Sequence, residues 1–150
     1  MSESDNQKSK LADKRNHHKV LRKSADIAGN SMIEIKRKVA AANRIKIHYR
    51  ECGSGPPIVL LHGWPQTSYA WRKVMPRLAP HYRCIAPDLR GMGDTDKPLS
   101  GYDIRTIATD IHSLVETLGL QNVYLVGTDW GGLAARRLSL IHICRCRRIE

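Results

Sequence analysis

An aspartate in a glycine-flanked turn is the strongest candidate for a reactive residue in this 150-residue chain. Gly127 and Gly131 stand two residues to either side of Asp129, directly after an apolar run from Val123 to Val126. This is the spacing of the tight strand-to-helix turn G-x-S-x-G, with an acid in place of the serine. Such a turn holds its central side chain out at the end of the strand, beside a helix N-terminus that favours negative charge. Asp129 is therefore a candidate nucleophile.

A carboxylate at this position predicts a different chemistry from that of a serine. It can displace a leaving group at a saturated carbon and become an ester of the substrate. Water can then attack the ester carbonyl while backbone N–H groups stabilise the oxyanion. The predicted reaction is two-step hydrolysis of an epoxide or an alkyl halide. The turn alone leaves open the alternative that Asp129 is only a turn or helix cap, because Asp is common at both places.

Short apolar strands and helices alternate around this turn. The strongest helix pattern begins after the cap Asp103 and ends at Gly119, with apolar residues at i, i+3, i+4 and i+7. A second helix is expected from Thr67 or Ser68, with Trp71, Val74, Met75 and Leu78 on one face and Pro76 kinking or shortening it. Strands are expected over 32–39, 44–50, 58–61, 82–86 and 123–126.

This alternation predicts an α/β fold with a mostly parallel sheet and helices on both faces. The segment 44–50 alternates strictly, with Ile45, Ile47 and Tyr49 on one face, and is predicted to be a half-buried antiparallel strand near a sheet edge. The loops at the carboxyl ends of the parallel strands are expected to converge on one site.

Three motifs lie in loops that follow expected strands, namely His62-Gly-Trp-Pro65, Asp88-Leu-Arg-Gly-Met-Gly93 and Gly127-Thr-Asp-Trp-Gly-Gly132. In this order and spacing they resemble the α/β-hydrolase family, within it the epoxide hydrolase and haloalkane dehalogenase branch, over roughly residues 44–137. The resemblance implies that Asp129 is the nucleophile.

The resemblance also implies roles for the neighbouring residues. Backbone N–H groups of Trp64 and Trp130 would form the oxyanion hole, as expected for a strand-end loop and for the residue after the acid. Trp64, Pro65 and Trp130 would line the substrate pocket. The motif residues His62, Gly63, Asp88, Arg90, Gly127 and Gly131 are interpreted as structural, with His62 a hydrogen-bonding loop residue rather than a base.

Single residues separate the branches of this family. Fluoroacetate-type dehalogenases hold the substrate carboxylate with arginines where this chain has Trp130 and Leu133, so that branch is disfavoured. Haloalkane dehalogenases resemble the chain at Trp130 but usually carry a polar residue where Trp64 stands, which favours the epoxide hydrolases. Thr128 is a departure, because the family usually has His before the nucleophile.

The sequence is expected to be a fragment that is inactive as given. The family's His base, its acid and the cap domain with two tyrosines all follow the nucleophile, and His142 is the only later histidine here. We therefore expect an incomplete, N-terminal half of the fold with an exposed strand edge and no cap domain, capable at best of slow alkylation at Asp129. Residues 138–150 resemble a translated sequencing adapter; the alternative is a genuine continuation of the helix.

Charge and composition set the remaining expectations. The net charge is +11, of which residues 1–50 contribute +8, residues 51–137 +1 and residues 138–150 +2. Residues 1–30 are interpreted as a disordered basic tail and residues 31–137 as the partial hydrolase domain. A non-catalytic nucleic-acid-binding protein is the alternative, disfavoured because no aromatic residue interleaves with the basic run.

Several kinds of partner leave no signal in the sequence. No metal cluster, phosphate loop or dinucleotide fingerprint is found, so we expect no metal and no cofactor, only a small-molecule substrate and water. No apolar run is long enough to cross a membrane. The four cysteines show no C-x-x-C pairing, and we interpret them as reduced thiols of a cytoplasmic protein.

Overall fold

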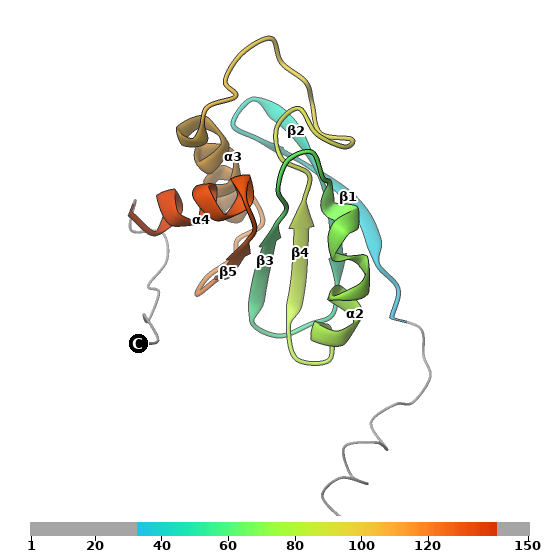
Figure 1. The fold of residues 1–150 in the computed structure, drawn as a ribbon. Helices are drawn as coiled ribbons and strands as arrows, with labels where there is room; N and C mark the ends of the chain where they lie inside the picture. The colour runs from blue at the N-terminus through green and yellow to red at the C-terminus, as the bar shows by residue number, and fades with distance from the viewer. Residues whose placement is uncertain (1–32, 141–150) are drawn as a thin grey trace, which may run out of the picture. The chain divides into compact units, whose positions relative to one another are not determined.

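A five-stranded sheet organises the computed structural model, which describes residues 33–140. The expectations for residues 1–32 and 141–150 lie outside the described residues. The strands stand in the order β1-β2-β4-β3-β5, with β3 parallel to β4 and β5, and β2 antiparallel to both of its neighbours (Figure 1). Their bounds are β1 Lys36–Ala42, β2 Ile45–Cys52, β3 Pro57–Leu61, β4 Arg83–Pro87 and β5 Tyr124–Gly127. The expected α/β fold is confirmed, including the antiparallel strand near one edge. Over residues 33–140 the sheet is mixed rather than mostly parallel, because β1 and β2 add two antiparallel pairs to the two parallel ones.

Alternation along the strands divides the core into two layers. Val59 and Leu61 of β3 face one side of the sheet, and Ile58 and Leu60 face the other. Both sides are buried, which explains why β3 and β4 read as continuous apolar runs. The first layer continues through Ile45, Ile47, Tyr49 and Ile85, and the second through Cys52, Cys84 and Ala86.

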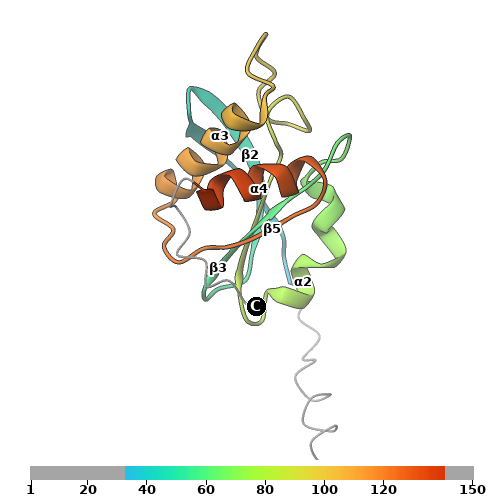
Figure 2. The same cartoon turned by 60° about the vertical axis from the view of Figure 1, so that its left-hand side comes forward.

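Two helices, α3 Ile104–Thr117 and α4 Trp130–Leu140, cover the first face of the sheet (Figure 2). α3 begins at the predicted cap, because Asp103 Oδ1 accepts a hydrogen bond from Thr106 N at 3.0 Å. Its apolar stripe, from Ile107 to Val115, is buried against the strands. The chain leaves the helix through Gly119 at φ +62°.

The second face is covered by a helical segment that Pro76 divides. It consists of a 3-10 helix η1, Ser68–Lys73, capped by Thr67, and one α-helical turn α2, Met75–Leu78. Pro76 lies in the first turn of α2, where its missing N–H costs nothing. The break also shifts the periodicity, so the prediction that Val74 lies on the buried face is wrong: it is exposed, while Met75 is fully buried.

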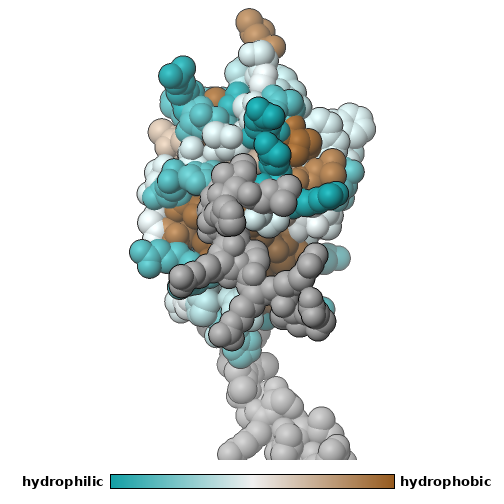
Figure 3. All heavy atoms as spheres, turned by 90° about the vertical axis from the view of Figure 1, so that its left-hand side faces the viewer, coloured by the Kyte–Doolittle hydropathy of each residue, from teal (hydrophilic) through white to brown (hydrophobic). Residues whose placement is uncertain are grey.

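The side of the molecule formed by β5 and α4 exposes apolar residues. Figure 3 looks onto this side and shows apolar side chains at its surface. Tyr124 and Val126 of β5 and Leu133 of α4 are all exposed. Within residues 33–140, β5 pairs with β3 alone, so its second edge has no partner strand there.

None of the helices in that same range is both long enough and apolar enough to span a lipid bilayer.

Candidate active site

The turn between β5 and α4 has the expected elbow geometry. Asp129 sits at φ +50°, a left-handed backbone conformation that is rare outside glycine. A Cβ on Gly131 would lie 2.4 Å from the Leu61 carbonyl oxygen, and one on Gly127 would lie 2.4 Å from the Gly131 carbonyl oxygen. Both glycines are therefore required by the close approach of β3, β5 and α4. The turn is further anchored by Thr128 N, which donates to Leu61 O at 3.1 Å.

The carboxylate of Asp129 meets the loop that follows β3. Trp64 N donates a hydrogen bond to Asp129 Oδ2 at 2.9 Å. Gly63 permits this approach, since a Cβ there would lie 2.8 Å from Asp129 Cβ. Trp130 is the first residue of α4, where backbone N–H groups have no partner within the helix and favour a negative charge. The structure thus brings the predicted acid into contact with one of the two predicted oxyanion donors.

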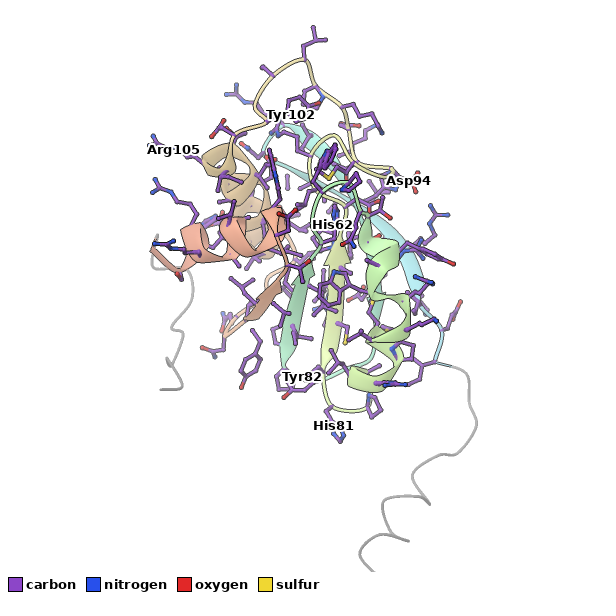
Figure 4. The ribbon with its side chains drawn as sticks, in the orientation of Figure 1. His62, His81, Tyr82, Asp94, Tyr102 and Arg105 are labelled. Atoms are coloured by element: carbon purple, nitrogen blue, oxygen red, sulfur yellow. The ribbon has the colours of Figure 1, made fainter. Side chains whose placement is uncertain are left out.

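His62 ties two of the motif loops together from a fully buried position (Figure 4). Its Nε2 accepts a hydrogen bond from Leu89 N at 3.0 Å, so Nδ1 carries the proton and donates to Gly63 O at 2.9 Å. Burial lowers the pKa of His62, which keeps the ring neutral. Because both nitrogens are engaged, His62 is not free to activate a water molecule.

The buried His62 predicts an acid-sensitive fold. Its folded-state pKa lies below the ordinary value of 6.5, so the unfolded chain takes up a proton at higher pH than the folded chain. The free energy of unfolding should fall as pH decreases below about 6.5 and level off below the folded-state pKa. Urea titrations across this range measure the slope. His62→Gln, whose amide oxygen can still accept from Leu89 N, should reduce it; an unchanged slope would contradict the assignment.

Asp88 holds the second motif loop in place. Its Oδ1 accepts from Ser68 N at 2.6 Å, and its Oδ2 accepts from Asp94 N at 3.0 Å. Its backbone carbonyl accepts the Thr95 hydroxyl hydrogen bond at 2.8 Å. The loop turns tightly around this buried carboxylate, since a Cβ on Gly93 would lie 2.2 Å from Asp88 Oδ2. Asp88 therefore connects the loop after β4 to the start of η1.

Arg90 makes a buried, bidentate ion pair with Asp110 of α3. Arg90 Nε donates to Asp110 Oδ2 and Arg90 Nη2 to Asp110 Oδ1, both at 2.7 Å. Asn43 Nδ2 also donates to Asp110 Oδ1, at 2.6 Å. Sequence reasoning missed Asp110, although a signal existed: it lies three residues after Ile107 on the apolar stripe, and a buried acid needs a partner.

A pocket of about 420 Å³ opens next to the elbow. Both tryptophans predicted for the substrate site line it, whereas Pro65 and Asp129 are outside its lining and exposed. Tyr102, which no sequence pattern had marked, also lines it; its ring packs on Gly91 and its hydroxyl donates to Pro98 O at 2.6 Å. The lining consists of Trp64, Arg90, Gly91, Met92, Tyr102, Ile107 and Trp130.

The elbow, the sheet order and the comparison with known families agree on one class of protein. Residues 56–149 match the family model described as the alpha/beta hydrolase fold. The chain therefore belongs to the α/β-hydrolase fold family.

Three similar proteins place the chain more closely within that family. It is 53% identical over 102 residues to a soluble epoxide hydrolase of Corynebacterium sp. (strain C12), covering 68% of this chain and 36% of the relative. An epoxide hydrolase structure from Vigna radiata matches with a TM-score of 0.69 and 42% identity, over 71% of this chain and 36% of that one. A haloalkane dehalogenase loop variant from Bradyrhizobium elkanii matches with a TM-score of 0.68 and 39% identity, over 71% and 36%. The chain thus spans about a third of the length of these relatives.

Proposed function

We propose that this chain carries the nucleophile-bearing part of an epoxide hydrolase and that Asp129 forms an ester with the substrate. The observation that supports this most directly is the pairing of a left-handed backbone at Asp129 with the hydrogen bond from Trp64 N to its Oδ2. A carboxylate that served only as a helix cap would bond to amides of α4. This one projects instead toward the loop after β3.

The two carboxylate oxygens have different roles in this mechanism. Oδ2 is held by the Trp64 amide, so Oδ1 is the oxygen that attacks the epoxide carbon and opens the C–O bond. The released alkoxide oxygen takes a proton from a solvent water molecule, and the product is a hydroxyalkyl ester of Asp129. When water attacks the ester carbonyl, charge develops on Oδ2, where the Trp64 N–H already points. The Trp130 N–H at the start of α4 is the second donor proposed for this oxyanion.

The pocket favours a neutral, apolar substrate. Two tryptophans, Met92, Tyr102 and Ile107 form most of its wall. The charge of its cation, Arg90, is already neutralised by a two-point ion pair with Asp110, which weakens its attraction for a substrate carboxylate. These features support an epoxide with an apolar substituent over a carboxylate-bearing substrate such as a haloacid.

Hydrolysis of the ester needs a base that residues 33–140 do not place at the elbow. His62 has both ring nitrogens engaged, and His48 lies on β2, outside the lining of the pocket beside the elbow. His81 lies at the opposite end of β4 from the elbow (Figure 4). His112 is paired with Glu116 on the outside of α3. We therefore propose that the chain as given is alkylated once and does not turn over. His142 lies outside the described residues.

Covalent labelling tests the proposal on the chain as it stands. After incubation with styrene oxide, we expect mass spectrometry to find one epoxide added to the peptide containing Asp129, as an ester that hydroxylamine removes. Asp129→Asn should abolish this hydroxylamine-sensitive label, while Asp94→Asn, which alters an exposed carboxylate, should retain it. Equal ester labelling of the Asp129→Asn variant would refute the assignment of Asp129 as the nucleophile.

Haloalkane dehalogenation is the second candidate, because the side chains of Trp64 and Trp130 both line the pocket. Indole N–H groups can donate to a leaving halide. A primary alkyl bromide distinguishes the two functions. Faster ester formation at Asp129 with the bromide than with the epoxide, accompanied by stoichiometric bromide release, would favour the dehalogenase; the reverse order is expected.

A further inference from the structure

The two buried cysteines of the second core layer lie directly across from one another. In the antiparallel pair formed by β2 and β4, Cys52 is the register partner of Cys84. Both side chains point to the face covered by α2, where they pack with Met75, and both thiols are free. The Cys84 thiol donates weakly to the backbone carbonyls of Met75 and Tyr82, both at 3.8 Å. We propose that Cys52 and Cys84 are a redox-sensitive modification site, which hydrogen peroxide converts to a disulfide joining β2 to β4.

The Cα spacing of the two strands lies within the range that a disulfide can join. Asp88 N donates to His48 O at 2.8 Å, which marks 48/88 as a hydrogen-bonded position of the ladder. Hydrogen-bonded positions recur every two residues, so Cys52 and Cys84 also occupy one, where opposing Cα atoms are about 5.5 Å apart. Disulfides most often join Cα atoms about 5.5–6 Å apart. A disulfide also needs the two Cβ atoms within about 3.5–4.5 Å, whereas opposing Cβ atoms at a hydrogen-bonded position are about 5.5 Å apart. The bond therefore requires the two strands to approach each other by about 1 Å at this end of the ladder.

The reaction balances with peroxide as the oxidant. One thiol sulfur attacks a peroxide oxygen, and the O–O bond breaks to give a sulfenic acid and one water molecule. The second thiol then attacks that sulfur, expelling a second water molecule as the S–S bond forms. Each cysteine gives up one electron and one proton, and peroxide is reduced to water. Hydrogen peroxide is small enough to reach Cys52 at the end of β2, which is 6% exposed.

Burial makes this reaction slow and selective. It raises the pKa of Cys52 and raises that of Cys84 to about 12, so both stay protonated near neutral pH. A single buried thiol of this kind is protected from oxidation. The pair differs from a single thiol because a sulfenic acid formed on either cysteine has a second thiol directly opposite it on the neighbouring strand.

The disulfide would stabilise the part of the fold that carries the His62–Pro65 motif. β4 is the strand through which the β1–β2 hairpin is attached to the parallel strands. A disulfide between residues 52 and 84 would also close a loop that contains β3, the His62–Pro65 motif and η1. Oxidation should therefore raise the thermal midpoint of unfolding by several degrees.

Peptide mapping without reduction tests the proposal on the full wild-type chain. Native protein is treated with excess hydrogen peroxide, alkylated and digested, and a parallel sample is oxidised in urea. We expect the native sample to yield one linked pair, Cys52 with Cys84, lighter by two hydrogen atoms than the free peptides. The urea sample should yield mixed pairings that include Cys144 and Cys146.

Single-cysteine variants test whether oxidation links Cys52 specifically to Cys84. Cys52→Ser should leave Cys84 as a thiol under the same treatment, and Cys84→Ser is its counterpart. Circular dichroism verifies that each variant remains folded. Native oxidation that links either residue to Cys144 or Cys146 in preference would overturn the proposal. So would Cys52 and Cys84 remaining thiols after the other two are oxidised.

Discussion

Replacing Asp110 by alanine is expected to lower the free energy of unfolding by about 3–5 kcal/mol. Asp110 accepts two hydrogen bonds from Arg90 and one from Asn43, and both members of the ion pair are almost fully buried. Alanine would leave the Arg90 guanidinium in the interior without its counter-charge. Breaking one partner of a buried pair costs far more than the pair itself contributes, since the remaining ion is desolvated and uncompensated. Equilibrium urea unfolding measures the difference.

An exposed ion pair in the same domain provides the matched control. Arg37 pairs with Asp94, and both side chains are at least half exposed. Asp94→Ala should therefore change the free energy of unfolding by about 1 kcal/mol or less. If Asp110→Ala and Asp94→Ala lowered the free energy of unfolding by similar amounts, breaking the buried pair would cost no more than breaking the exposed one, and the prediction would be wrong.

Adjacent glycines at the start of α4 are expected to respond in opposite ways to the same substitution. Gly131→Ala would put a Cβ 2.4 Å from the Leu61 carbonyl oxygen and 2.6 Å from that of His62. Both are backbone atoms of β3 and its loop, which cannot move aside without displacing the elbow. A Cβ on Gly132 would meet Gly127 O at 3.4 Å, an ordinary contact.

We expect Gly131→Ala to destabilise the domain by about 3 kcal/mol, at the upper end of overpacking effects. Gly132→Ala should be neutral or stabilising by up to about 1 kcal/mol, because alanine is the better helix former. Thermal unfolding followed by circular dichroism compares the two. The same pair bears on function, since a displaced elbow should slow ester formation at Asp129 in the Gly131→Ala variant alone. Equal behaviour of the two variants would argue against the close packing.

The parts of the site that depend on neighbouring residues could be predicted from the sequence. The elbow requires only Gly127, Asp129 and Gly131 at fixed spacing after an apolar run, and all three positions are determined locally. The strands were predictable for the same reason: alternation at Ile45, Ile47 and Tyr49 reflects a local geometric rule. The sequence therefore predicts the elements that carry Asp129.

Contacts between distant segments could not be predicted in this way. Arg90 and Asp110 are twenty residues apart, and only the packing of α3 against the loop after β4 brings them together. Tyr102 reaches the pocket from a loop that has no periodicity. The error at Val74 has a different origin. Pro76 predicts a break in the helix, but the new start of the helix after this break also moves the buried face.

The two edge strands of the sheet, β1 and β5, differ in how well they resist pairing with another molecule. β1 begins with three consecutive cations, Lys36, Arg37 and Lys38, which would repel the same strand of another molecule at low ionic strength. β5 carries no charge from Tyr124 to Gly127 and exposes two of its four residues. Physiological salt shortens electrostatic repulsion to a range of about 8 Å, so it weakens protection at β1 and changes nothing at β5. Clustering of this polypeptide in concentrated solution should thus begin at β5.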